Sequence, residues 1–158
     1  PQLHCLVMTA DTTGIGALVT AVDHVGIAVA DLDEAIAWYR DNLGLEADHV
    51  ETNEEKGVRE AMLSTPGDSG TQIQLLAPLN EQSTIAKFLD RNGPGLQQLA
   101  YRVRDIDAAG AALRAKGLRL LYDEPRNGTA GSRVNFVHPK DAGGVLVELV
   151  EPAADAHH

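Results

Sequence analysis

The sequence predicts an α+β fold in which two tandem βαβββ modules form one curved, mixed sheet around a cleft. The main observation is an internal repeat. The stretch around His24 recurs around Gln98, and Gln74 recurs as Glu148, so positions 24 and 98, like positions 74 and 148, differ by 74 residues. One spacing that relates both the start and the end of a unit indicates a duplicated module.

Each unit begins with a strand that leads into a helix. In the first unit, residues 22–29 alternate between large apolar side chains and small or polar ones, as a half-buried strand does. Asp31 followed by Glu34 is typical of a helix start, because such side chains can cap the free backbone N–H groups of the first turn. Apolar residues at helical spacing continue to Leu43, and Gly44 suits the left-handed conformation that follows a helix.

The remaining elements complete the units and set the domain boundaries. We expect further strands at residues 46–50, 59–64 and 71–76, then a strand at 99–103, a helix at 107–116 and strands that end near Val150. A linking helix at residues 83–92 stops at Gly93 and Pro94, which break helices. The predicted single domain covers residues 21–152, with modules at about 21–80 and 95–152, an N-terminal extension at 1–20 and a C-terminal tail at 153–158.

The composition narrows the classes of partner. The 158 residues carry a formal net charge of −10 at pH 7. A surface this acidic disfavours nucleic acid and anionic membranes, which need clusters of Lys and Arg. No apolar run is long enough to cross a bilayer, and the first Lys or Arg is Arg40, which argues against a basic leader segment. The single cysteine, Cys5, cannot form an internal disulfide, so we expect a cytoplasmic protein.

Four polar residues on the first and last strands of the two units are candidates for a metal site. His24 and Gln74 belong to the first unit, and Gln98 and Glu148 hold the matching positions of the second. Pairing the units about a pseudo-twofold axis would bring the four side chains into one metal cleft. An imidazole nitrogen, amide oxygens and a carboxylate suit a divalent ion such as Co, Mn, Ni, Mg or Zn, and leave positions free for water or substrate.

Seven segments resemble one known family. They are DHVGIAV (residues 23–29), NEEKGVREAM (53–62), QIQLLAPL (72–79), STIAKFL (83–89), LYDEP (121–125), SRVNFVHPK (132–140) and GGVLVEL (143–149). Together they are similar to the methylmalonyl-CoA epimerases, a family of the vicinal oxygen chelate superfamily, which is also called the glyoxalase/bleomycin resistance superfamily. The resemblance extends over residues 21–152, which is nearly everything outside the two termini.

The resemblance implies an activity and roles for named residues. The implied reaction is metal-dependent epimerisation of (2R)- and (2S)-methylmalonyl-CoA, by removal and return of the C2 proton through an enolate. The family's metal ligands fall on His24, Gln74, Gln98 and Glu148. Its catalytic acid–base groups fall first on Glu60 and then on Glu148, which would also be a ligand. The resemblance further implies a CoA thioester as substrate and a homodimer.

One position departs from the family pattern. Family members usually carry histidine where this chain has Gln98. Glutamine can offer a carbonyl oxygen, but as a weaker and harder ligand than imidazole, which would shift the metal preference toward oxygen-loving ions.

Two cations and two alternative functions complete the expectations. Arg133 and Lys140 are candidates to bind the carboxylate or the CoA phosphates of the substrate. Another enzyme of the superfamily, such as a glyoxalase-like isomerase or lyase, would share the cleft and the metal but not these motifs. A metal-poor small-molecule binding protein is the alternative that Gln98 favours.

Overall fold

The elements of the chain follow the order that the repeat predicts. The computed structural model describes residues 18–68 and 70–154. The first module contains β1 (Val19–Ala28), α1 (Leu32–Leu43), β2 (Glu46–Asn53), β3 (Val58–Ser64) and β4 (Gln72–Pro78). Helix α2 (Thr84–Asn92) links it to the second module, which contains β5 (Gly95–Val103), α3 (Ile106–Ala115), β6 (Arg126–Asn127), β7 (Arg133–Val137) and β8 (Val147–Glu151). Two 3₁₀ turns, Thr129–Gly131 and Pro139–Asp141, flank β7.

One mixed sheet joins the two modules. Its strand order is β2-β3-β4-β1-β5-β8-β7-β6, with β1 and β5 antiparallel at the centre. The parallel pair β1–β4 of the first module matches the parallel pair β5–β8 of the second. The register repeats as well, because Met62 stands opposite Gln74 just as Phe136 stands opposite Glu148. The α+β fold of two βαβββ modules is therefore confirmed.

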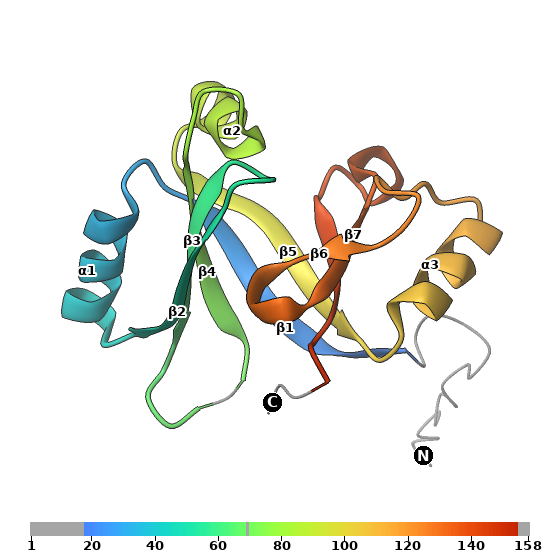
Figure 1. The fold of residues 1–158 in the computed structure, drawn as a ribbon, viewed down its shortest axis with the longest axis horizontal. Coiled ribbons are helices and arrows are strands. Elements are labelled where there is room, and N and C mark those ends of the chain that lie inside the picture. The colour runs from blue at the N-terminus through green and yellow to red at the C-terminus, as the bar shows by residue number, and fades with distance from the viewer. Residues whose placement is uncertain (1–17, 69, 155–158) are drawn as a thin grey trace, which may run out of the picture.

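The sheet curves into a trough with a helix on each outer side. Figure 1 shows α1 outside the wing formed by β2, β3 and β4, and α3 outside the wing formed by β7 and β8. Because alternate residues of a strand face opposite sides, each wing buries one apolar row under its helix and turns the other row into the trough. The buried rows include Ala61, Leu63, Leu75 and Ala77 in the first module, and Val137 and Leu149 in the second.

Helix α2 closes one end of the trough. Its residue Ile85 packs with Ala28, Val58 and Leu76, which lie on the trough side of the first module. The hydroxyl of Ser83 accepts a hydrogen bond of 3.1 Å from the backbone N–H of Ala86, so the helix begins where the linking helix is expected. This packing brings the linker between the modules against one end of the cleft.

The helix boundaries in each module follow local capping. The side chain of Asp31 accepts a hydrogen bond of 2.9 Å from the backbone N–H of Glu34, and Gly44 has φ 70° after the last turn of α1. Asp105 caps α3 in the same way, through the N–H of Ala108 at 3.0 Å. The helix start expected at Asp31 and the end expected at Gly44 are both found.

The first strand begins before the predicted start of the domain at residue 21. Strand β1 begins at Val19, inside the extension expected at residues 1–20, because its pairing with β5 continues to Val103. Leu18 packs against the core of the second module. Most of the expected extension and tail, and Cys5 with them, lie outside the described residues. Within residues 18–68 and 70–154, no helix is both long enough and apolar enough to cross a membrane.

Candidate active site

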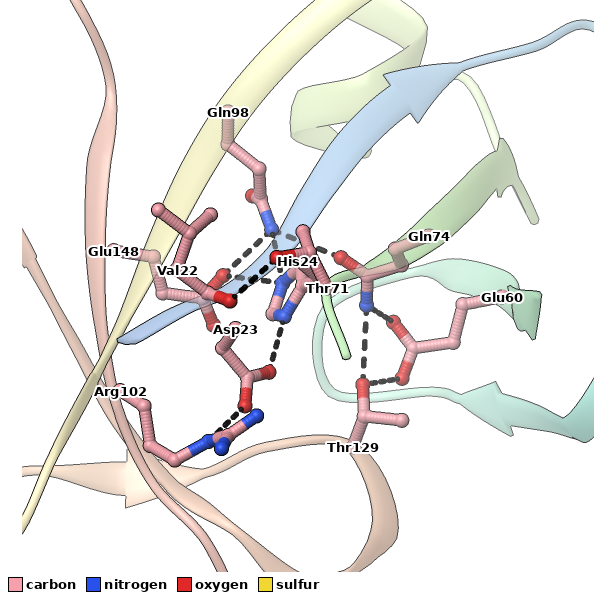
Figure 2. A network of polar contacts seen from close by, with 10 residues as sticks. All are labelled: Val22, Asp23, His24, Glu60, Thr71, Gln74, Gln98, Arg102, Thr129 and Glu148. Carbon is pink, nitrogen blue, oxygen red and sulfur yellow. Dashed lines mark hydrogen bonds and ion pairs between the residues drawn. The ribbon is translucent and has the colours of Figure 1, made fainter. Parts of the chain in front are cut away.

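The four polar residues selected by the repeat meet at the centre of the trough. They come from the neighbouring strands β4, β1, β5 and β8, and Figure 2 shows their side chains turned toward one another. The Nε2 atom of His24 lies 3.0 Å from Oε2 of Glu148. The amide nitrogen of Gln98 lies 2.9 Å from Oε1 of Gln74 and 2.6 Å from Oε2 of Glu148. The structure thus unites residues that are far apart in the sequence.

The donor atoms of this cluster fit a divalent cation. His24 Nε2, Gln74 Oε1 and Glu148 Oε2 converge on one point, which the amide nitrogen of Gln98 occupies in the structure. Nitrogen and oxygen donors of this mixed kind suit first-row and alkaline-earth ions. Within the described part of the chain, no group of three or more His, Cys, Asp or Glu side chains could hold a metal. Any cation at this centre would therefore depend on the glutamines as well.

His24 is fixed between two carboxylates. Its Nδ1 lies 2.7 Å from Oδ2 of Asp23, and Oδ1 of Asp23 accepts a hydrogen bond of 2.9 Å from Nε of Arg102. Burial by itself lowers the pKa of His24, but the hydrogen bonds and charges of Asp23 and Glu148 outweigh burial and raise the pKa to about 9. A second carboxylate that orients the ring of a ligating histidine is a common feature of metal sites.

Glu60 lies on β3 beside the centre and is buried, with 3% of its surface exposed. Its carboxylate accepts hydrogen bonds from the hydroxyl of Thr129 at 2.5 Å and from the amide of Gln74 at 3.1 Å. Burial, and then the carboxylate of Glu51 on the paired strand β2, raise the pKa of Glu60 to about 7. A carboxylate with this pKa is suited to take up and release protons near neutral pH.

Gln74 connects Glu60 to the centre. Its oxygen faces the amide of Gln98, while its nitrogen donates to Glu60 and, at 3.1 Å, to the hydroxyl oxygen of Thr129. The amide cannot turn over without placing its oxygen against the carboxylate of Glu60. The orientation that directs the oxygen of Gln74 to the centre is therefore fixed from both ends, by Glu60 and Thr129 at the nitrogen and by Gln98 at the oxygen.

Two cavities reach the centre. The larger one, of about 330 Å³, is lined by Glu60, Gln98 and residues of α2, together with the aromatic side chains of Tyr122 and Phe136. The smaller one, of about 110 Å³, is lined in part by His24, Glu148 and Thr129. The larger cavity is big enough for a small organic ligand, because such pockets usually measure a few hundred Å³.

The two cations expected to bind substrate lie elsewhere. Arg133 forms ion pairs with Asp107 of α3 at 3.0 Å and with Glu151 at 3.6 Å. Arg133 is on the helix side of β7. Phe136, three residues later, faces the trough opposite Glu148, and side chains an odd number of residues apart on a strand face opposite sides. Lys140 is exposed on the 3₁₀ turn Pro139–Asp141 and does not line either cavity.

Two other cations line the larger cavity. The guanidinium of Arg126 lies 3.9 Å from the ring centre of Tyr122, and the ammonium of Lys56 lies 5.7 Å from the ring centre of Phe136. Thr129, three residues after Arg126 in the chain, donates a hydrogen bond to Glu60. The sequence carries only a weak signal for these residues, since Arg126 and Thr129 lie in a stretch with almost no regular structure.

Comparison with known proteins agrees with the fold. A profile of the glyoxalase/bleomycin resistance protein/dioxygenase superfamily matches residues 23–136. The ethylmalonyl-CoA/methylmalonyl-CoA epimerase of Cereibacter sphaeroides is 42% identical over 134 residues, which is 84% of this chain and 98% of that protein.

Solved structures give the same result. The crystal structure of methylmalonyl-CoA epimerase from Mycobacterium tuberculosis is 64% identical, with a TM-score of 0.83 over 86% of this chain and 90% of that one. A methylmalonyl-CoA epimerase in complex with methylmalonyl-CoA and NH4⁺ is 50% identical, with a TM-score of 0.81 over 86% and 96% of the two chains. The chain belongs to the glyoxalase/bleomycin resistance protein/dioxygenase superfamily and, within it, to the family of methylmalonyl-CoA epimerases.

Proposed function

We propose that this protein is a metal-dependent epimerase that interconverts (2R)- and (2S)-methylmalonyl-CoA. The observation that carries the proposal is a pair of buried carboxylates, Glu60 and Glu148, on opposite sides of one polar centre (Figure 2). Inversion at a carbon next to a carbonyl needs a proton to leave one face and another to arrive on the opposite face. One carboxylate cannot easily reach both faces, so two flanking groups suit the reaction.

The centre between the carboxylates is the proposed cation site. His24, Gln74, Glu148 and the oxygen of Gln98 would hold a divalent ion of the Co, Mn, Ni, Mg or Zn group. When bound, such an ion supplies Lewis-acid stabilisation of the negative charge that develops on the oxygen atoms of the substrate.

The side chains of the protein carry the proton transfers. Glu60 takes the proton from C2, and the electron pair of the broken C–H bond moves into the adjacent carbonyl group to form the enolate. The carboxylic acid of Glu148 then donates a proton to the other face of C2. For the reverse reaction the two carboxyl groups exchange roles. The hydroxyl of Thr129 and the amide of Gln74 hold Glu60 in place through their hydrogen bonds to its two oxygens.

The larger cavity suits the acyl and pantetheine end of a CoA thioester. The names of the relatives include methylmalonyl-CoA and ethylmalonyl-CoA as substrates, and one related structure holds methylmalonyl-CoA. The amide oxygen of Gln97, which lines this cavity, is buried, and no hydrogen-bond donor among the described residues reaches it. A buried acceptor of this kind is satisfied when a ligand supplies an N–H group, and the pantetheine arm of CoA has two.

The phosphates of CoA are expected to meet Lys56 and Arg126, because these are the cations that line the larger cavity. Replacing Arg126 with Ala should raise KM for methylmalonyl-CoA about tenfold, with a smaller change in kcat, since hydrogen bonds to a charged group contribute about 1.5–3 kcal/mol. Steady-state kinetics with CoA and pantetheine thioesters would measure this effect.

The pantetheine thioester is the control for that experiment, because it lacks the CoA phosphates. Its KM should be nearly the same for the Arg126→Ala variant and the parent protein. Lys140→Ala, at an exposed position outside both cavities, should leave both substrates unaffected. An equal rise of KM for both thioesters would show that Arg126 does not contact the phosphates.

The overall activity is tested by exchange at C2. (2S)-methylmalonyl-CoA is incubated in deuterated water with the protein and one of Co²⁺, Mn²⁺, Ni²⁺, Mg²⁺ or Zn²⁺, and deuterium at C2 and the appearance of the 2R epimer are followed. We expect both with at least one ion. Exchange no faster than the protein-free background with every ion would refute the epimerase proposal and leave a binding protein as the alternative.

We further infer a homodimer that works in the cytoplasm. The family resemblance supports the homodimer, and the single cysteine supports the cytoplasmic location. Sedimentation equilibrium would give the oligomeric state directly.

A further inference from the structure

The amide nitrogen of Gln98 occupies the point at which the other site residues converge. It lies 2.6 Å from Glu148 Oε2, 2.9 Å from Gln74 Oε1 and 3.4 Å from His24 Nε2. Its two N–H groups match the two oxygen acceptors, which lie closer than His24 does. An N–H₂ group has a positive outer surface, so it satisfies the same acceptors that a cation would bind.

The backbone of Gly26 makes this position possible. Gly26 on β1 stands opposite Gln98 on β5. A Cβ atom at Gly26 would lie only 2.3 Å from Cγ of Gln98 and 3.0 Å from its Cδ. The side chain of Gln98 therefore crosses β1 at Gly26, where no side chain blocks it, and its amide reaches the centre. Another residue at position 26 would push the side chain away.

We propose that Gln98 is an internal substitute for the cation: its N–H₂ group fills the centre in the cation-free protein and must turn away before a divalent ion binds. The amide turns its oxygen toward the ion, which keeps Gln98 as a ligand. The identity of the centre rests on the proposed function, but the position of the amide does not.

The substitute has two consequences. A cation must compete with two hydrogen bonds, one of them to a carboxylate, so the apparent affinity is lowered by a factor on the order of 10 to 100. Gln74 also keeps its oxygen toward the centre and its nitrogen toward Glu60, because Gln98 donates to that oxygen. The geometry around Glu60 is thus already formed before the ion arrives.

Solution NMR of the cation-free protein tests the position of the amide. The side-chain N–H₂ protons of Gln98 should exchange with solvent at least about tenfold more slowly than those of Gln82, which is exposed. Saturation with Mg²⁺ or Zn²⁺ alone, without substrate, should remove this protection, while the backbone amides of β1 and β5 stay protected. Exchange as fast as that of Gln82 in the cation-free protein would overturn the proposal, as would protection that survives saturation.

Two variants add an independent measurement, the dissociation constant for Mn²⁺ from calorimetry. Gln98→Ala removes the substitute together with its oxygen ligand, so the two effects offset each other and affinity should fall by less than tenfold. Gln98→His supplies an imidazole nitrogen in place of the amide and should bind Mn²⁺ at least about tenfold more tightly. A loss of tenfold or more in Gln98→Ala would mean that the oxygen already points inward, and the proposal would fail.

Gly26→Ala tests the path of the side chain while Gln98 itself is kept. The added methyl group should displace the side chain and abolish the protection of its N–H₂ protons in the cation-free protein. Gly95→Ala on β5 is the matched control, because a Cβ there meets no atom within 4 Å. These readouts need no turnover, so protected Gln98 protons without C2 exchange would refute the proposed function alone, and C2 exchange without protection would refute this inference alone.

Discussion

Glu60→Gln is expected to lower kcat for epimerisation by about 10²- to 10⁴-fold, the usual contribution of a positioned general base. Glutamine keeps the size of the side chain, and its oxygen can still accept a hydrogen bond from Gln74 while its N–H₂ group donates to the hydroxyl oxygen of Thr129. It cannot take the proton from C2. Glu60 is not among the residues that converge on the cation centre, so the dissociation constant for Mn²⁺ should change by less than about threefold. Stopped assays of epimerisation and calorimetry would measure the two quantities.

The same substitution should stabilise the protein at alkaline pH. The pKa of Glu60 is raised in the folded state, from 4.5 to about 7, chiefly by burial. Between these values the unfolded chain releases a proton that the folded protein retains, so stability falls as pH rises through this window. The pKa of Glu51 is shifted the opposite way, so its contribution to stability grows as pH rises toward 4.5 and is constant above that value. Glu60→Gln removes this loss of stability. The free energy of unfolding of the variant should therefore exceed that of the parent by an amount that grows from pH 4.5 to 7 and is on the order of 2 kcal/mol at pH 8.

Chemical denaturation at pH 5 and pH 8 would measure the gain in stability. Glu46→Gln, which removes an exposed carboxylate from the paired strand β2, should change neither activity nor this pH dependence. An active Glu60→Gln variant would remove Glu60 from catalysis. An inactive variant with weakened Mn²⁺ binding would assign Glu60 to the cation site instead.

Glu148→Gln is expected to have the largest effect, with kcat lowered at least about 10³-fold and Mn²⁺ affinity at least about tenfold. This carboxylate is both a proposed ligand and the proposed acid for the second proton transfer, so one change removes two contributions. The pKa of His24 should also fall well below about 9, because Glu148 is one of the two carboxylates that raise it. NMR titration of the His24 ring would follow that change.

The matched control for Glu148→Gln is Glu151→Gln on the same strand. Glu151 lies on the helix side of β8, where it accepts a hydrogen bond from the backbone N–H of Ile106 at 3.2 Å. Its replacement should leave kcat, Mn²⁺ affinity and the His24 titration unchanged. Full Mn²⁺ affinity in Glu148→Gln would exclude this carboxylate from the cation site, whatever its activity.

The sequence predicts the centre of the site well because strand geometry leaves little freedom there. Side chains alternate between the two faces of a strand, so a repeat that places His24 and Gln98 in register also assigns them one face. The parallel pairing of the first and last strands of each module then adds Gln74 and Glu148. These positions follow from periodicity and the duplication, before any resemblance is used.

The surroundings of the centre could not be predicted in the same way. Arg133 and Arg126 are equally ordinary cations in the sequence, and only the register of β7 turns the first toward α3 while the second reaches the cavity. Thr129 comes from a turn whose path depends on contacts with distant strands. The pKa of Glu60 depends on burial and on Glu51 across the sheet. None of these properties has a local signature in the sequence.

The seam between β1 and β5 also bears on how such a protein could have arisen. Each half of the duplication supplies two of the four residues at the centre, and the sheets of the two halves pair with each other along this seam. A single half would therefore hold an incomplete set of donors. An ancestor of half this length would have had to associate with a second copy of itself to assemble a site, and gene fusion would then have allowed the halves to diverge. Val134 illustrates that divergence, because it stands opposite Val150 in the second half just as Glu60 stands opposite Leu76 in the first.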